Sequence, residues 1–222
     1  MKNKKSVILL SGGLDSTVSL AVSKEEYNIE LALTFDYGQK PASEEIEAAA
    51  RISKYYNIRH EVIQLPFLAK ISSASLVSDA DIPKENLGTK ESAKAVWIPN
   101  RNGLFLNIAA AYADSYGFSH VIFGANKEEA QTFPDNTKEF TQAVTKSFEY
   151  STLVQAEAFA PLIDCDKIEI AGLALEHKAP LEMIKSCYEA GGKNCGECES
   201  CKRFKAALEH HKAYDYIKRL FK

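Results

Sequence analysis

The sequence has no strong excess of charge of either sign and no long hydrophobic run. Its 27 basic and 30 acidic residues give a formal net charge of -3, so there is no overall attraction to nucleic acid or to an anionic membrane. No apolar run approaches the ~18 residues of a membrane span, and the run after the basic start at residues 1–5 is too short for a signal peptide. We therefore expect a cytoplasmic protein with no membrane partner and no stable binding to nucleic acid.

Two common phosphate-binding motifs are also absent. The chain contains neither G-x-x-x-x-G-K-S/T nor G-x-G-x-x-G, which are the usual P-loop and the usual dinucleotide-binding fingerprint. Any nucleotide site in this chain therefore uses a different loop.

Cysteine is scarce outside one short stretch. Four of the five cysteines lie between residues 187 and 201, and in a cytosolic chain such crowding indicates a metal site rather than disulfides. The fifth, Cys165, is expected to be a small buried hydrophobic residue. A length of 222 residues with 45% hydrophobic residues suits one sizeable core with a small appended module.

A Ser/Gly-rich turn follows the apolar run at residues 6–10. Such a run, a turn and then an amphipathic stretch indicate a buried strand, a tight loop and a helix. Gly12 and Gly13 allow the backbone to turn sharply, and the amides of the loop then point at one spot at the positive end of the helix dipole. This geometry suits a phosphate group, although glycine pairs and Asp-Ser are also ordinary turn and cap residues.

The first half of the chain alternates between short apolar runs and helical patterns. This alternation predicts βαβ units and a mainly parallel sheet, with ligands at the C-terminal ends of the strands. Ser43 and Asn100 are expected to cap the helices that start beside them. The expected strands are 6–10, 29–35, 60–65 and 120–123, and the expected helices are 17–26, 43–56, 100–116, 137–149 and 202–211.

Residues 66–95 form a long stretch with little periodicity. They contain Pro66, Pro83 and Gly88. Loops of this length inside a compact domain are typically binding loops, lids or mobile segments. We expect a lid over the substrate.

Polar and aromatic residues gather where the expected strands end. Arg101 at a helix start could pair with a phosphate or a carboxylate in bidentate fashion, or be solvated. Trp97 is the only tryptophan, and large aromatic residues of this kind more often lie in a core than in a ligand platform. The pair Glu128-Glu129 could hold magnesium, recognise a base edge or face solvent. Phe133 to Asn136 offers a stacking face with a carboxylate, or a helix cap.

The cysteines have the pattern C-x7-C-x2-C-x2-C with glycines between them. Four thiolates at such spacings can surround one tetrahedral zinc ion and leave no open position, so the site would be structural. A four-cysteine iron–sulfur cluster and metal-free thiols are the alternatives. The predicted ligands are Cys187, Cys195, Cys198 and Cys201.

The loop from Ser11 to Thr17 resembles the S-G-G-x-D-S pyrophosphate loop of the N-type ATP pyrophosphatases, a group that includes GMP synthetase, NAD synthetase and several tRNA-thiolating enzymes. The resemblance implies that ATP is cleaved between its α and β phosphates and that AMP is attached to a carbonyl or carboxylate oxygen. It further implies that pyrophosphate leaves from this loop and that the end of the second strand lies near the adenosine.

Together with residues 35–39, 97–102, 124–136 and the Ser-Cys-Tyr at 186–188, the chain resembles the 7-cyano-7-deazaguanine synthase family of the queuosine pathway over essentially its whole length. The resemblance implies an adenine-nucleotide-hydrolase-like (Rossmann-like) α/β domain over residues 1–180, a zinc-binding helical module over residues 181–222, and a homodimer. The implied ligase converts 7-carboxy-7-deazaguanine, ammonia and ATP to the nitrile through an adenylated carboxylate and an amide. The chain has no room for a glutaminase domain, so free ammonia is the expected nitrogen source.

The resemblance assigns roles to individual residues. Asp15 is expected to help position the Mg²⁺ that accompanies ATP, and Lys40 or Arg101 to stabilise the α-phosphate. The expected ATP contacts are Leu10, Ser11, Gly12, Gly13, Leu14, Asp15, Ser16, Thr17, Phe35, Tyr37, Gly38 and Gln39. The expected contacts of the base are Trp97, Asn100, Arg101, Asn102, Asn126, Glu128, Phe133 and Asp135.

The chain departs from the family pattern at three places. Pro41-Ala42 stands where a histidine is usual, Asn136-Thr137 replaces Cys-Arg after Phe-Pro-Asp, and Ile184-Lys185 replaces Thr-Trp. Two other functions therefore stay open. One is a related enzyme that adenylates a different carboxylate or a tRNA base, as in tRNA thiolation, and the other is a zinc-stapled nucleotide-binding module without catalysis.

Overall fold

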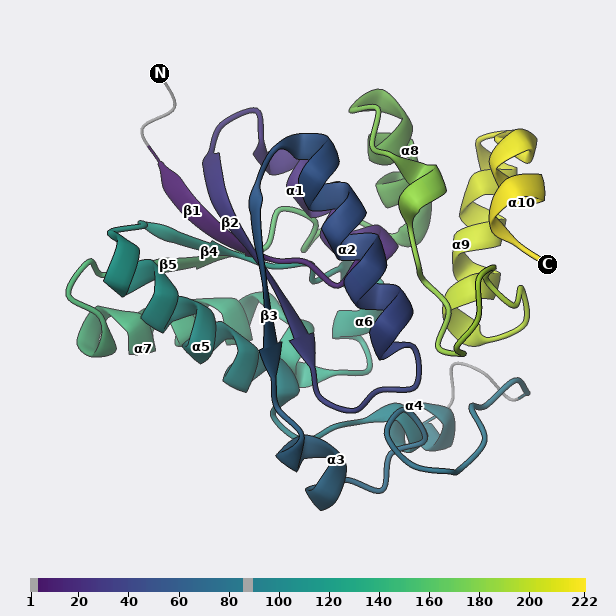
Figure 1. Cartoon of the computed structure of the whole chain (residues 1–222), viewed down its shortest axis with the longest axis horizontal. Coiled ribbons are helices and arrows are strands. Elements are labelled where there is room, and N and C mark those ends of the chain that lie inside the picture. Colours follow the sequence, from purple (N-terminus) through teal and green to yellow (C-terminus); the bar gives the residue numbers. More distant parts are fainter. Residues whose placement is uncertain (1–3, 86–89) are drawn as a thin grey trace.

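A five-stranded parallel sheet forms the centre of the protein (Figure 1). The structure is a computed structural model that describes residues 4–85 and 90–222. Neighbouring strands follow the order β3-β2-β1-β4-β5, and every pair is parallel. The strands are β1 (Lys5–Leu9), β2 (Asn28–Asp36), β3 (Arg59–Gln64), β4 (His120–Ile122) and β5 (Glu157–Phe159).

Helices cover both faces of the sheet (Figure 1). Adjacent side chains of β1 point to opposite faces, so Val7 packs in one hydrophobic cluster with Leu106, while Ile8 packs in the other with Leu20 and Ile52. The longer helices are α1 (Leu14–Ser23), α2 (Ala42–Tyr56), α5 (Arg101–Tyr116), α7 (Lys138–Ser151), α8 (Lys167–Glu176) and α9 (Glu199–His210). The shorter ones are α3 (Phe67–Ile71), α4 (Lys90–Val96), α6 (Lys127–Ala130), α10 (Tyr214–Leu220), and the 3-10 turns η1 (Pro134–Asn136) and η2 (Leu181–Met183).

The expected parallel α/β fold is confirmed, and the four expected strands and five expected helices are present with small shifts at their ends. The sequence reading missed β5, which has only three residues and no apolar run, and it missed α8 and α10. The first helix begins at Leu14 instead of residue 17, because the phosphate-loop turn leads into the helix without a linker.

Of the two expected helix caps, Ser43 was wrong and Asn100 was right in position. Ser43 lies inside α2, whose N-cap is Pro41, since proline already holds the backbone angle that a helix start needs. Asn100 occupies the N-cap position of α5 as expected, but it is in a left-handed conformation and its side chain makes no cap hydrogen bond. Residues 134–136 form the turn η1, and the Thr137 hydroxyl accepts the amide of Phe140 at 3.1 Å as the cap of α7. Cys165, which was expected to be a buried hydrophobic residue, is only half-buried.

The long stretch at residues 66–95 contains α3 and the start of α4. Residues 86–89, including Gly88, lie outside the described part of the chain, as do residues 1–3 of the basic start. Leu76 and Ile82 are buried in the main cluster, and the Lys40 amide donates to the Leu76 carbonyl at 2.9 Å. The described part of this stretch is therefore packed onto the domain, and its role as a lid stays a prediction.

In the C-terminal part, α9 packs against α8, and α8 in turn packs against α1 of the sheet domain (Figure 1). Cys187, Phe204 and Leu208 belong to the same buried cluster as Val18 and Leu106. The division at residue 180 stays a prediction, but the two parts share one core. No helix in the described ranges combines the length and the apolar character needed to cross a membrane.

Candidate functional site

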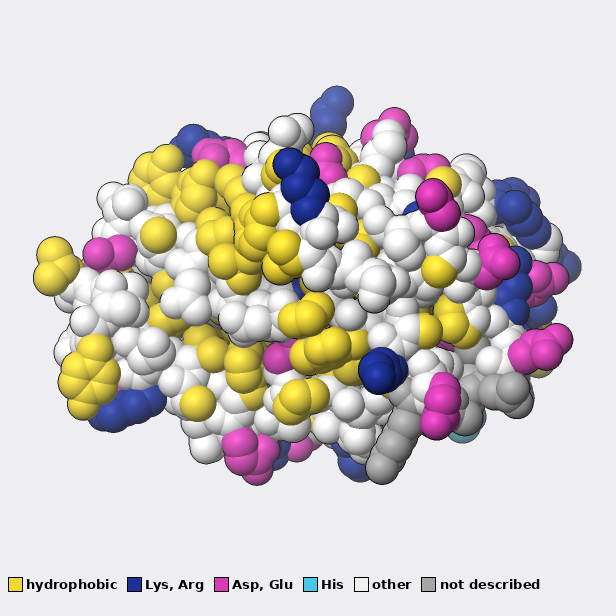
Figure 2. Space-filling view, turned by 90° about the horizontal axis from the view of Figure 1, so that it is seen from below, with side chains coloured by type: hydrophobic (Ala, Val, Ile, Leu, Met, Phe, Trp, Pro, Cys, Tyr) yellow, Lys and Arg dark blue, Asp and Glu magenta, His cyan; other side chains and the backbone are white. Residues whose placement is uncertain are grey.

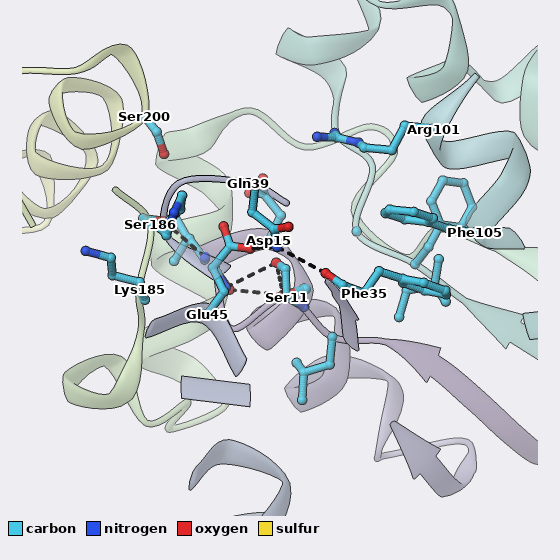
Figure 3. A pocket seen from close by; sticks show the side chains of 18 of the residues that line it. Ser11, Asp15, Phe35, Gln39, Glu45, Arg101, Phe105, Lys185, Ser186 and Ser200 are labelled. Atoms are coloured by element: carbon cyan, nitrogen blue, oxygen red, sulfur yellow. Dashed lines mark hydrogen bonds between the residues drawn. The ribbon is translucent and has the colours of Figure 1, made fainter. Parts of the chain in front are cut away.

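A cavity of about 230 Å³ opens at the C-terminal ends of β1, β2 and β4 (Figure 3). One wall is the loop from Ser11 to Ser16, a second comes from β2 and α5, and a third comes from residues 185–204 of the C-terminal part. This is the edge of a parallel sheet at which ligands bind, because helix N-termini and loop amides converge there.

The loop between β1 and α1 is tightly braced. Gly12 has φ +78°, and a Cβ at this position would lie 2.7 Å from Cβ of Ala48, so only glycine fits. The Thr17 hydroxyl donates to the Gly13 carbonyl at 2.7 Å, and the Gly13 amide donates to Oγ of Ser11 at 3.3 Å. Side-chain hydroxyls therefore hold both the carbonyl and the amide of Gly13, which lines the cavity.

A buried charge cluster lies at the start of α1. Nζ of Lys167 is 2.5 Å from Oδ2 of Asp15 and 3.2 Å from Oε1 of Glu129. Burial raises the pKa of Asp15, and this effect outweighs the attraction of Lys167, which lowers it. Burial alone would lower the pKa of Lys167, but the two carboxylates raise it. Lys167 therefore stays charged, and the cluster carries one net negative charge when both carboxyls are ionised.

Asn126 joins this cluster to the end of β4. Its Oδ1 accepts the amides of Glu128 and Glu129 at 3.0 Å each as the cap of α6, and its Nδ2 lies 3.3 Å from Oδ2 of Asp15. Asn126 is fully buried. The amide therefore holds Asp15 and the acidic turn together without lining the cavity itself.

One oxygen of Asp15 has no partner among the described residues. Its Oδ1 is buried and makes no hydrogen bond, and such an orphaned carboxylate oxygen is costly unless a ligand completes it. Hard cations such as Mg²⁺ prefer carboxylate oxygens. The residues present therefore fit the Mg²⁺ expected to accompany ATP.

Aromatic rings line the side of the cavity away from the C-terminal part (Figure 3). The rings of Phe35 and Phe105 stack with centroids 4.0 Å apart. An Nη atom of Arg101 donates to the Tyr37 hydroxyl at 3.1 Å, and burial raises the pKa of Tyr37 despite this cation. An apolar wall with a half-buried guanidinium beside it suits a nucleobase and a phosphate.

Glu45, on the first turn of α2, is a carboxyl group in the cavity that the sequence reading did not select. Nε2 of Gln39 donates to it at 2.8 Å and also to the Phe35 carbonyl at 3.0 Å. Burial raises the pKa of Glu45 to about 7, against the hydrogen bond from Gln39 and the charge of Arg101. Glu45 therefore titrates near neutral pH.

A second cavity of about 100 Å³ adjoins the first and shares several walls with it. The rings of Trp97 and Phe133 lie nearly parallel there, with centroids 5.6 Å apart. Asp135 is also in the wall, and burial raises the pKa of its carboxyl. Residues in the walls of both cavities are Leu76, Arg101, Glu129, Lys167, Tyr188 and Ser200.

The structure brings most of the expected site residues to these cavities. The larger cavity is lined by Leu10, Ser11, Gly13, Leu14, Asp15, Ser16, Phe35, Tyr37, Gln39, Arg101 and Asn102. The smaller one is lined by Trp97, Arg101, Phe133 and Asp135. Gly12, Thr17, Gly38, Lys40, Asn100, Asn126 and Glu128 are not in either wall.

Lys40 and Glu128 have other partners. Nζ of Lys40 donates to the Ala80 carbonyl at 2.5 Å, so the expected catalytic lysine points toward the long stretch rather than into the cavity. Glu128 accepts the Lys167 amide at 2.9 Å and lies 3.3 Å from Nη1 of Arg203. Its carboxylate therefore ties α6 to α8 and α9.

The four cysteines of the C-terminal part converge. All their sulfur atoms lie within 4.8 Å of one another, and those of Cys195 and Cys201 are 3.8 Å apart. Tetrahedral zinc–sulfur bonds of about 2.3 Å place thiolates about 3.8 Å apart, whereas a cluster with each thiolate on a different iron holds them farther apart. The donor set therefore fits one metal ion, with zinc the plausible one.

Sequence reasoning missed several residues of the larger cavity. Lys185, Ser186, Tyr188 and Ser200 line it, and each lies within two residues of a cysteine ligand. Residues 184–188 entered the sequence analysis only through the family resemblance and Ser200 not at all, so none of the four was predicted to line the site. Lys167 carried no sequence signal, because it is an ordinary first residue of a helix after the Asp166 cap.

Comparison with known proteins gives a match over nearly the whole chain. The family model described as "Queuosine biosynthesis protein QueC" matches residues 5–212. A 7-cyano-7-deazaguanine synthase of Carboxydothermus hydrogenoformans is 49% identical over 210 residues, covering 92% of this chain and 98% of that protein. One from Bdellovibrio bacteriovorus is 46% identical and covers 100% of this chain and 99% of its own length.

Solved structures show the same fold at low identity. The U34-tRNA thiolase NcsA of Methanococcus maripaludis, solved with its 4Fe-4S cluster, has a TM-score of 0.52 at 15% identity and covers 99% of this chain and 71% of its own. A 4-thiouridine synthetase in complex with RNA and bound ATP also has a TM-score of 0.52, at 21% identity, and covers 96% of this chain and 51% of its own. These likenesses concern the fold alone.

Proposed function

This chain belongs to the QueC family of queuosine biosynthesis proteins, and on that premise we propose how its two cavities serve the reaction. Its function is that of a 7-cyano-7-deazaguanine synthase, an ATP-dependent ligase-type enzyme. Whole-length relatives carry this name, whereas the likeness to tRNA thiolases extends only to the fold. Thiolation and a non-catalytic binding module are therefore not favoured.

The proposed reaction uses 7-carboxy-7-deazaguanine, ammonia and two molecules of ATP. The carboxylate attacks the α-phosphate of the first ATP, which forms the acyl adenylate and releases pyrophosphate. Ammonia displaces AMP and gives the amide. The amide oxygen attacks the α-phosphate of the second ATP and takes its adenylyl group, which releases a second pyrophosphate, and loss of AMP and of both N–H protons then leaves the nitrile. Two carbon–oxygen bonds are broken in total, and each oxygen departs on AMP.

ATP is proposed to lie in the larger cavity. Its adenine would rest against the aromatic wall of Phe35 and Phe105, and its pyrophosphate end would face the amides of the loop from Ser11 to Ser16. The stacked rings and the helix N-terminus at opposite ends of one cavity support this orientation. Mg²⁺ at the free oxygen of Asp15 would neutralise charge that develops on the departing phosphates.

The acid substrate is proposed to lie in the smaller cavity. The parallel rings of Trp97 and Phe133 offer a stacking surface for the deazaguanine, and the buried Asp135 carboxyl offers an acceptor for its amidine-like edge. The reacting carboxylate would then meet the α-phosphate where the two cavities share walls. Arg101 and Lys167 are the cationic residues that line both cavities. We therefore assign stabilisation of the α-phosphate charge to them and not to Lys40.

The four-cysteine site is proposed to hold a structural zinc ion. Its ligands would be Cys187, Cys195, Cys198 and Cys201, which leave no open position for substrate. The ion would stabilise the C-terminal wall of the cavity. Cysteines that bind a metal must stay reduced, and this suits a reducing compartment and supports a cytoplasmic location.

A homodimer is proposed to form along the outer edge of β3. β3 is the last strand on its side of the sheet, and unpaired edge strands with apolar side chains favour association. Val62 on β3, Phe67 on α3 and Tyr116 at the end of α5 are each 39–45% exposed. Figure 2 shows hydrophobic side chains gathered on the face that carries α3 and α5. Light scattering of wild type and of Val62→Lys tests this, with a monomeric variant expected.

The observation that carries the proposal is the shared wall of a nucleotide-sized cavity and a stacking cavity at one sheet edge. It is tested by measuring pyrophosphate release from ATP with 7-carboxy-7-deazaguanine and ammonium present or omitted, with products identified by mass. Release that depends on the acid, and a nitrile that needs ammonium, are expected. No release with this acid, but release with another carboxylate, would overturn the substrate assignment.

A further inference from the structure

The segment before the first cysteine ligand crosses directly over the phosphate loop. The Lys185 amide donates to the Gly12 carbonyl at 2.8 Å, and Oγ of Ser186 accepts the Leu14 amide at 3.3 Å. Both residues also line the larger cavity (Figure 3). The loop that faces the nucleotide is therefore in contact with the peptide that leads into the metal site.

Residues within the cysteine-bearing turn hold this segment in place. Oδ1 of Asn194, which lies next to Cys195, accepts the amides of Ser186 and Cys187 at 3.1 Å each. Asn194 is 2% exposed, and its Nδ2 donates to the Leu220 carbonyl at 3.2 Å. The position of Ser186 is thus set by a buried amide inside the turn that carries the cysteines.

A second contact fixes the same turn against the sheet domain. Nζ of Lys185 donates to the Gly191 carbonyl at 2.8 Å, and the Gly191 amide donates to a carboxylate oxygen of Glu44 on α2. Lys185 is 5% exposed. The turn between Cys187 and Cys195 is therefore clamped to both the phosphate loop and α2.

The partner of the Leu14 amide is a hydroxyl in a position suited to a phosphate oxygen. Leu14 is the first residue of α1, and amides at a helix N-terminus attract anions. A serine hydroxyl has one donor and two acceptor lone pairs. Ser186 can therefore keep the Leu14 amide and donate to a phosphate oxygen at the same time. Oγ of Ser11 accepts the Gly13 amide in the same way.

We propose that Ser186 binds the pyrophosphate end of ATP and that the four-cysteine metal site, acting through Asn194, sets its position. This inference rests on the proposed function in that it takes the loop to hold the phosphates of ATP. Metal occupancy then determines phosphate affinity as well as the stability of the C-terminal part. Adenosine binding depends on the aromatic wall and is independent of this link.

Calorimetric titration of the metal-loaded protein with inorganic pyrophosphate, ATP and adenosine tests the residue. A hydrogen bond to a charged group is worth about 1.5–3 kcal/mol, so Ser186→Ala should weaken pyrophosphate and ATP binding by about ten-fold or more. Adenosine affinity and metal content should stay as in wild type. Ser43→Ala is the control, since Ser43 is exposed on α2 and lies outside both cavities.

Removal of the metal with a chelator tests the link. Pyrophosphate affinity of the wild type should fall while adenosine still binds, and in Ser186→Ala the same treatment should cause a much smaller further loss, because the two changes break one connection. If metal removal also abolishes adenosine binding, the same titrations are made on metal-loaded Asn194→Ala instead. It should retain metal and adenosine binding and lose pyrophosphate affinity.

The inference is overturned if wild type binds pyrophosphate and Ser186→Ala binds it equally well. It is also overturned if the losses from metal removal and from Ser186→Ala simply add. A wild type that binds neither pyrophosphate nor ATP would instead contradict the proposed function, so the two failures are distinguishable.

Discussion

Lys167 and Asp15 form a buried ion pair with Nζ and Oδ2 2.5 Å apart, although 152 positions separate them in the sequence. The pair places the N-terminus of α8 against the N-terminus of α1. Glu129 completes it from the turn after β4. Three elements that follow different strands are thus joined by one ammonium group at the phosphate loop.

Lys167→Met should destabilise the protein by about 3 kcal/mol or more, because it leaves Asp15 and Glu129 buried without their cation. It should also abolish pyrophosphate release. Urea unfolding and the release assay measure the two effects. Lys40→Met is the comparison, and it should change both only slightly, since Nζ of Lys40 contacts a backbone carbonyl outside the cavity. Equal losses in both variants would contradict this assignment.

Gly12→Ala should prevent formation of the phosphate loop. The new Cβ would meet Cβ of Ala48 at 2.7 Å and the Glu45 carbonyl at 3.0 Å, in addition to the left-handed strain of about 1–2 kcal/mol. Gly117→Ala carries similar strain at φ +69° but meets no atom within 4 Å. Pyrophosphate binding should be lost in the first variant and retained in the second. Retention in both would show that the loop tolerates a side chain.

The stability of the protein should fall between about pH 4.5 and pH 7 because of Glu45. Its folded-state pKa is raised from 4.5 to about 7 by burial, so the folded state keeps a proton that the unfolded state loses in this window. The associated stability is complete below pH 4.5 and lost above pH 7, and it amounts to about 3 kcal/mol at most.

Urea unfolding of Glu45→Gln at a series of pH values measures this effect. The variant stays neutral and keeps an acceptor for Gln39, so its decline with pH should be smaller and it should exceed wild type in stability at pH 8. Glu47→Gln, exposed on the same helix, should follow the wild-type curve. Parallel curves for wild type and Glu45→Gln would refute the buried titration.

Metal analysis of the purified protein should find about one zinc ion per chain and no visible iron–sulfur absorbance. Cys201→Ser removes one of four converging ligands and should lose the metal and lower the melting temperature, because Cys201 lies in the main core. Cys165→Ser is the control and should keep both values. Visible absorbance in protein prepared without oxygen would point to a cluster instead.

Local pattern was enough to predict the glycine-rich loop after the first strand, the alternating strands and helices, and the set of four cysteines that converge. Ser11 to Ser16 follows its strand directly, and the cysteines are spaced within fifteen positions, so the chemistry and the geometry both lie in short stretches. The parallel sheet then follows from the alternation of elements, because parallel strands need crossover helices. The same patterns carried the family resemblance.

Individual partners at the site were beyond the reach of pattern. Lys40 follows the strand whose end lines the cavity, yet its ammonium contacts Ala80, while Lys167 reaches Asp15 from a distant helix start. Side-chain direction depends on how helices pack, and no local signal reports it. Glu45 looked like an ordinary residue of a helix start, and its raised pKa exists only because folding buries it.

By itself the sequence determined a nucleotide-binding parallel α/β protein with a four-cysteine metal site, since strand alternation, a glycine turn and ligand spacing are properties of neighbouring residues. Tertiary structure alone decided that the cysteine-bearing segment is a wall of the larger cavity. Ser186 lies against Leu14 across 172 positions. Such a contact arises from the packing of α9 on α8 and of α8 on α1, and not from any preference of the segment itself.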